Sequence, residues 1–257
     1  MTQTNEPTIG ETETLFVVDS FATNYSGTTG AGVTWDYSTI TGYNGSTQDV
    51  ELLDPSTDPN SASFAGATKL LSVGSIKQFF TSSASEKTSQ GFYYTEASLG
   101  DVIVTYENDP SILCTYPFAQ GGATVADNYD GSLNMTFNGF PVNEALTGTI
   151  NAEIDGEGTL LFPAGNSATN VIRYHSEDTA ATTLPIIGAV DVIKSQYEYY
   201  DYASSNLPIF IHISLTILPS GGGTPISETS FVLSKYDGIF VSVDEVEQFD
   251  FTVAPNP

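Results

Sequence analysis

Apolar and polar residues alternate in short stretches along most of this chain. The clearest alternation lies in residues 209–217, where isoleucine or leucine occupies every second position and His212, Ser214 and Thr216 lie between them. Successive side chains of a β-strand point to opposite faces of the sheet, so this stretch predicts a strand with one apolar and one more polar face. Such strands are typical of antiparallel sheets, whose second face is often solvated.

Further strands are predicted wherever Val, Ile, Thr, Tyr and Phe dominate a short run that ends in Gly, Asn, Asp, Ser or Pro. These runs are residues 15–19, 33–37, 49–53, 78–81, 91–95, 102–106, 133–137, 148–154, 158–162, 170–174, 192–200 and 229–236. Asp155-Gly156 suits a tight hairpin turn, and residues 163–166 suit the next turn, so residues 148–174 are expected to form a three-stranded meander. One short helix is predicted over the alanine-rich residues 60–71.

These elements predict an all-β fold, either an antiparallel β-sandwich or a curved half-barrel, with at most one or two short helices. A length of 257 residues fits one all-β domain. We find no tandem repeat and no break in composition that would divide the chain. We expect an N-terminal tail over residues 1–14, a single all-β domain over residues 15–246 and a separate C-terminal stretch over residues 247–257.

The charge balance excludes some partners. The chain holds 31 acidic and 6 basic residues, a net charge of −25. A nucleic-acid partner is not expected, because such proteins neutralise phosphates with Lys and Arg, and anionic membrane surfaces would repel this chain. No run of 18 apolar residues occurs, so membrane insertion is not expected either. Residues 1–6 lack the basic and apolar regions of a signal peptide, which fits either a mature chain with an added start methionine, the preferred interpretation, or a native cytosolic start.

No catalytic residue can be assigned from the sequence. Cys114 is the single cysteine and has apolar neighbours, which predicts an ordinary buried thiol. His175 and His212 are the only histidines and lack metal-ligand spacing, so each is expected to be a surface or half-buried residue. A serine nucleophile has no G-x-S-x-G context. Paired carboxylates for glycoside hydrolysis remain open, because their roles depend on separations that the sequence does not reveal.

Two stretches are candidate binding sites. Asp127, Asn128 and Asp130 offer hard oxygen ligands, so calcium is the one cofactor that the sequence leaves open, although a structural turn capped by these side chains is the preferred interpretation. The second stretch is a run of tyrosines that would stack on a glycan or a protein partner if they were exposed, whereas half-buried tyrosines at a sheet edge are the preferred alternative. The run consists of Tyr197 and Tyr199 on one strand face, and Tyr200 and Tyr202 on the other.

Four segments resemble type IX secretion cargo of Bacteroidota. Residues 27–38 form a glycine-rich lead into Thr-Trp-Asp-Tyr-Ser, and Tyr-Pro-Phe at 116–118 precedes Asp-Asn-Tyr-Asp-Gly at 127–131. Residues 156–173 are similar to a Gly-x-Gly-Thr-Leu hairpin of these proteins, and residues 251–257 resemble the start of their C-terminal sorting domain. The meander also distantly resembles LolA-like carriers, whose half-barrels cradle an acyl chain.

The resemblance to export cargo implies a location and a machinery rather than an activity. The chain would be the ectodomain ahead of a truncated sorting domain, with residues 247–257 as linker and sorting tail, ending in Pro255, Asn256 and Pro257. It implies secretion to the medium or outer cell surface by the type IX machinery. Trp35 would anchor the core, and Arg173 would partner the acidic surface. Thr179, in an Asp-Thr-Ala match to the Bacteroidota O-glycosylation pattern, would carry a glycan.

We therefore expect a secreted or cell-surface, non-catalytic β protein with a binding, adhesion or assembly role. Its partner would be a second copy, a surface protein or a glycan. One alternative is an extracellular hydrolase of the glycoside type that uses paired carboxylates in a cleft. The other is a carrier of an apolar ligand, which requires a cavity of several hundred Å³ lined by apolar side chains.

Overall fold

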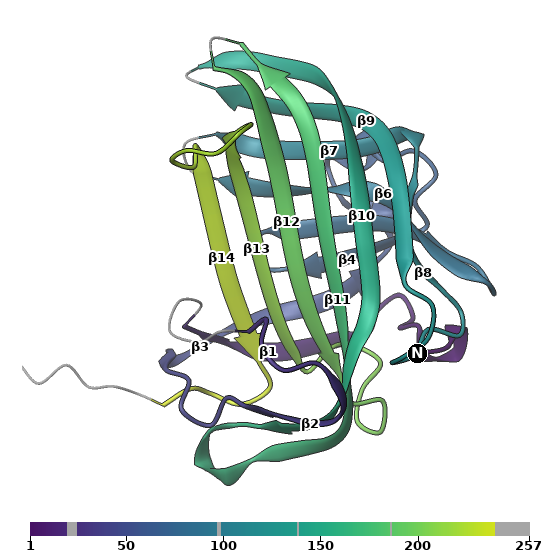
Figure 1. Ribbon diagram of the computed structural model, residues 1–257, viewed down its shortest axis with the longest axis vertical. Helices are drawn as coiled ribbons and strands as arrows, with labels where there is room; N and C mark the ends of the chain where they lie inside the picture. Colours follow the sequence, from purple (N-terminus) through teal and green to yellow (C-terminus); the bar gives the residue numbers. More distant parts are fainter. Residues whose placement is uncertain (20–24, 97–98, 138, 186, 240–257) are drawn as a thin grey trace, which may run out of the picture.

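The chain folds into one continuous sheet that curves round until it closes on itself (Figure 1). This computed structural model describes residues 1–19, 25–96, 99–137, 139–185 and 187–239. The strands are β1 (Thr12–Val18), β2 (Gly30–Asp36), β3 (Gly42–Leu53), β4 (Lys69–Val73), β5 (Ile76–Ser82), β6 (Glu86–Glu96), β7 (Gly100–Asp109), β8 (Ser111–Thr115), β9 (Val125–Phe137), β10 (Phe140–Leu161), β11 (Ser167–Leu184), β12 (Gly188–Tyr200), β13 (Phe210–Pro219) and β14 (Ser227–Ser234).

Short 3₁₀ turns are the only helical elements among the described residues, so the prediction of an all-β fold is confirmed. They are η1 (Gln3–Asn5), η2 (Pro55–Thr57), η3 (Ser61–Ser63) and η4 (Pro163–Gly165). No helix in the described part of the chain has the length and apolar character needed to cross a bilayer.

The order of the strands shows how the ring closes. Neighbours run β11-β12-β13-β14-β1-β3-β4-β5-β6-β7-β9-β10, and β10 pairs again with β11. All of these pairs are antiparallel, as predicted. Two strands lie off the ring: β8 pairs with β6, and β2 adds to β10 in parallel. Of the two shapes expected from the sequence, the curved one is present, and the curvature continues past a half-barrel to closure.

Strand β13 shows the predicted alternation. The aliphatic side chains of Ile211, Ile213 and Ile217 are fully buried, while His212 and the other polar positions are half-buried. The inward residues belong to a core cluster to which every strand of the ring contributes, so this cluster fills the interior. On the outer face, a second cluster packs residues from the stretch 25–40, Trp35 among them, against β10 to β14. Trp35 is 2% exposed, which confirms it as a core residue.

Three local predictions are wrong. Asp155-Gly156 is no hairpin turn, because β10 runs on through it with a bulge and the side chain of Asp155 pairs with Arg173, so residues 148–174 belong to two strands and not to a three-stranded meander. Residues 127–131 form part of strand β9 and not a turn. Residues 60–71 contain only η3 and the start of β4, since Leu70 and Leu71 pair with β5 instead of continuing a helix.

Candidate functional site

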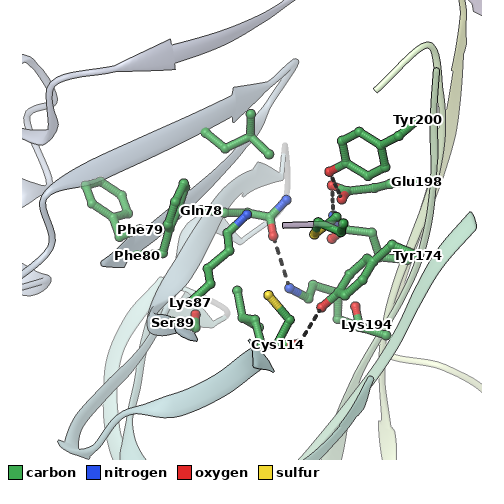
Figure 2. A pocket seen from close by; sticks show the side chains of 15 residues that line it. Gln78, Phe79, Phe80, Lys87, Ser89, Cys114, Tyr174, Lys194, Glu198 and Tyr200 are labelled. Atoms are coloured by element: carbon green, nitrogen blue, oxygen red, sulfur yellow. Dashed lines mark hydrogen bonds between the residues drawn. The ribbon is translucent and has the colours of Figure 1, made fainter. Parts of the chain in front are cut away.

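A small polar cavity lies inside the ring, between β5, β6 and β8 on one side and β11 and β12 on the other (Figure 2). The free space within it is about 30 Å³, which is room for about two water molecules. Its lining combines apolar residues with ten buried or half-buried polar residues. The polar members are Gln78, Lys87, Ser89, Cys114, Tyr174, Ser176, Lys194, Gln196, Glu198 and Tyr200.

Lys194 is the central cation of this site. It follows Val190 and Val192 on the inward face of β12, so the two-residue repeat of the strand carries it into the interior. Its ammonium lies 3.4 Å from Gln78 Oε1 and 4.7 Å from the centre of the Phe92 ring. Burial lowers the pKa of Lys194, because the charged form loses its hydration.

Asp178 and Glu198 supply the nearby carboxylates. Asp178 accepts hydrogen bonds from the hydroxyls of Tyr106 and Tyr129, whose rings stack 4.1 Å apart, and burial raises the pKa of this carboxyl group. Glu198 accepts a bond of 2.5 Å at each oxygen, from Gln196 Nε2 and from the Tyr200 hydroxyl. Both carboxylates are thus held by fixed donors on the ring itself.

Lys87 and Glu6 form the rim of the site. The ammonium of Lys87 lies 3.9 Å from Glu6 Oε1 and 4.2 Å from the centre of the Phe80 ring. Burial acts to lower the pKa of Lys87, but the carboxylates of Glu6 and Glu198 outweigh it and raise this pKa. Cys114 faces Lys87 across the β6–β8 pair, is 1% exposed and has its thiol pKa raised by burial. The predicted buried thiol is therefore confirmed.

Two polar atoms at the cavity lack a partner. Gln196 Oε1 and Gln78 Nε2 are buried and accept or donate no hydrogen bond within the described protein. Unpaired buried polar atoms are costly, and the free space beside these two atoms is large enough for water. The described residues contain no group of three or more His, Cys, Asp and Glu side chains placed to hold a metal ion.

Arg173 lies in a separate buried pair and not on the acidic surface, so its predicted role is wrong. Its Nε and Nη2 donate to the two oxygens of Asp155 at 2.7 and 2.8 Å. Its remaining donors reach the carbonyls of Tyr25, Gly27 and Thr28 at 2.9–3.2 Å. A guanidinium that binds a carboxylate through two N–H donors has further donors available, so Arg173 also holds residues 25–28 against the outer face of the ring.

The tyrosines of the predicted binding patch are not on the surface. Tyr197, Tyr199 and Tyr200 are at most 7% exposed, and Tyr202 is half-buried. The predicted division between faces is confirmed, because Tyr197 and Tyr199 belong to the outer cluster while Tyr200 packs with Cys114 and Tyr202. The preferred interpretation of buried or half-buried tyrosines holds, and an exposed stacking platform is absent from these four residues.

The same outer face carries a row of stacked rings across three strands. His175, Tyr197 and His212 are cross-strand neighbours, with ring centres 4.3 and 6.0 Å apart and planes within 7° of parallel. Burial lowers the pKa of both histidines, that of His212 to about 4. Both imidazoles are therefore neutral at pH 7, and both are half-buried as predicted.

The remaining candidate residues are separated by the strands that carry them. Asp127 lies on the face of β9 opposite to Asn128 and Asp130, and its Oδ2 accepts a bond of 2.7 Å from the Ile112 amide. The structure thus does not bring the three proposed calcium ligands together. Thr179 lies half-buried within β11. Pro255, Asn256 and Pro257 lie outside the described residues.

The interior cluster of Lys194, Gln196 and Glu198 was not predicted from the sequence. A signal was present, because these residues continue the phase of Val190 and Val192 in a strand whose apolar alternation gives way to polar side chains. The strands that face these three residues are set by closure of the sheet, which cannot be predicted from a local sequence pattern. Comparison of the chain with protein-family models, with curated proteins and with solved structures gives no match.

Proposed function

We propose that this chain is a secreted or cell-surface, non-catalytic protein that binds partners or assembles through its exterior. The observation that carries the proposal is the filled ring: the cavity at the buried lysines leaves about 30 Å³, too little for a sugar or an acyl chain. The polar groups around it are largely engaged with one another. Contacts with partners therefore have to be made outside the ring.

The distribution of charge supports a binding role and narrows the partner. All six Lys and Arg residues are described, and each is buried or half-buried, so none is exposed. Exposed carboxylates are numerous on the same molecule. They are Asp36, Asp49, Asp54, Asp101, Glu107, Asp109, Asp130, Glu157, Glu177 and Glu228. A surface of one sign steers cationic partners and repels anionic ones, so a cationic or neutral surface protein or glycan fits better than a membrane or a nucleic acid.

Strand β2 offers one place for assembly. Among the described strands it pairs with β10 alone, and most of its residues are exposed. An unpaired strand edge can add a strand from another chain through main-chain hydrogen bonds. Export by the type IX machinery belongs to the same proposal and rests on the resemblance of residues 251–257 to a sorting tail.

Two measurements on the full chain test the proposed role. Light scattering over a concentration series should show reversible self-association, or a cationic or neutral surface protein or glycan should bind saturably. The proposal would be overturned by turnover of a glycoside that is lost in Glu153→Gln or Glu177→Gln, whose side chains line one surface cleft, and retained in the exposed control Glu228→Gln. Stoichiometric uptake of a fatty-acid probe would favour the carrier instead.

Localisation needs its own test. Antibodies raised against the ring should label intact cells of the native host or detect the chain in the medium. Detection only after cell lysis would refute the export part of the proposal.

A further inference from the structure

The N-terminal segment, residues 1–11, is bound to the ring like a peptide ligand. At one end, the Met1 carbonyl accepts a bond of 2.9 Å from the Phe118 amide. At the other end, Gly10 and Glu11 exchange backbone hydrogen bonds of 2.7 and 2.9 Å with Leu52. Between these ends, the segment covers a hollow on the ring lined by Leu52, Phe80, Lys87, Tyr200, Tyr202 and Leu207.

Glu6 is the anchor of this segment. Its Oε2 accepts a bond of 3.2 Å from Lys69 Nζ, and its Oε1 accepts one from the Tyr116 hydroxyl and lies 3.9 Å from Lys87 Nζ. Lys69 also donates to the carbonyl of Pro7 at 3.1 Å. The Glu6 side chain is only 5% exposed, so these charge-assisted contacts are largely shielded from water.

The receptor residues come from the ring and from the adjoining strand β8, and not from the segment. Lys69 comes from β4, Lys87 from β6, and Tyr116 directly follows β8. These two lysines are one third of the positive charge of a chain that carries 31 acidic residues. Although the chain has many more acidic than basic residues, Lys69 and Lys87 both pair with the one carboxylate of Glu6 in the N-terminal segment. That convergence is what a carboxylate-binding site requires.

We propose that Lys69, Lys87 and Tyr116 form a receptor for the segment 1–11, filled within one chain by its own segment and open to the same segment of a second copy. The inference rests on the proposed assembly function and names its partner. Each copy carries both the acidic segment and the receptor, so exchange between copies reproduces every contact without a new interface. Only the residues ahead of β1 have to move, and the ring stays closed.

Isotope mixing tests exchange with the wild-type chain. Unlabelled and ¹⁵N-labelled chains are mixed, incubated and treated with a carbodiimide, which joins a carboxylate and an amine that are in contact, as Glu6 and Lys69 are at 3.2 Å. Mass spectrometry then reads the isotopes of the Glu6–Lys69 cross-linked peptide. Exchange predicts mixed-isotope cross-links that increase with concentration and incubation. Cross-links of a single isotope type at all concentrations would overturn the proposal.

A labelled peptide of residues 1–11 tests the receptor itself. A full chain with Glu6→Gln, which weakens its own segment, should bind the peptide more tightly than the wild-type chain does. A peptide with Gln at position 6 should bind at least about tenfold more weakly, as expected for loss of a charged hydrogen-bond partner. Combining Lys69→Met with Glu6→Gln in the full chain should abolish binding of the peptide. The control is Lys235→Met, at a lysine that directly follows β14, and it should leave binding unchanged. Equal binding of both peptides would refute the receptor.

The two proposals fail in different ways. If light scattering shows self-association while all cross-links carry one isotope type, segment exchange is wrong and assembly through another surface stands. If the chain stays monomeric and binds neither partner nor peptide, both proposals are wrong.

Discussion

The loss of folding stability at acidic pH should depend on His212. The imidazole of His212 lies between the rings of Tyr25 and Tyr197, at 4.7 and 6.0 Å, and is 3.2 Å from Ser230 Oγ. Its Nδ1 is buried without a partner. Protonation would therefore place a charge in a buried position where no carboxylate of the described residues pairs with it, and burial lowers the pKa of His212 to about 4.

The direction and size of the change in unfolding free energy with pH follow from proton linkage. The unfolded chain binds a proton at this imidazole below pH 6.5, whereas the folded chain does not bind it until about pH 4. Stability from His212 is thus fully present above pH 6.5 and is lost as the pH falls from 6.5 to 4. Between pH 7 and pH 4.5 the loss amounts to about 2 kcal/mol.

The perturbation is His212→Phe, which keeps an aromatic ring in the stack and removes the titration. Urea unfolding followed by circular dichroism should show that the wild type loses about 2 kcal/mol more than the variant between pH 7 and pH 4.5. His175→Phe is the matched comparison, because it leaves the His212 contribution in place. An unchanged pH profile in His212→Phe would refute the reasoning, as would a titration of His212 near pH 6.5 by NMR.

Two substitutions and one labelling experiment probe the fold further. Arg173→Met should cost about 3–5 kcal/mol in urea unfolding, because it leaves the buried carboxylate of Asp155 without its cation, and a cost below about 1 kcal/mol would contradict the pairing. Gly158→Ala should cost about 1–3 kcal/mol of unfolding free energy, because its Cβ would lie 1.9 Å from the Val33 carbonyl oxygen and push β2 away from β10. Faster amide exchange confined to β2 would support this prediction, and unchanged exchange in β2 would contradict it. The Cys114 thiol should react with a thiol reagent only at the rate of unfolding, and fast labelling of the native chain would show that the interior is open.

The all-β class and the phase of the strongest strands could be predicted from the sequence, because both are local properties. In β13 the burial of Ile211 and Ile213 follows directly from a two-residue repeat. Turn prediction was less secure. Asp155-Gly156 has the composition of a hairpin, yet the ion pair of Asp155 and the close approach of the Trp35 ring to Gly156 keep the chain extended there. Those partners come from distant parts of the sequence.

What the sequence by itself determined is the strand content, the anionic character and the absence of an intramolecular disulfide, since composition and short-range alternation suffice for each. Closure of the ring through β10 and β11, the burial of Lys194 beside Asp178 and Glu198, and the capture of Glu6 by Lys69 and Lys87 were decided only by the tertiary structure. The physical reason is the separation along the chain of the residues that interact. Alternation acts between neighbouring residues, whereas a buried charge needs partners from strands that only the closed sheet brings together.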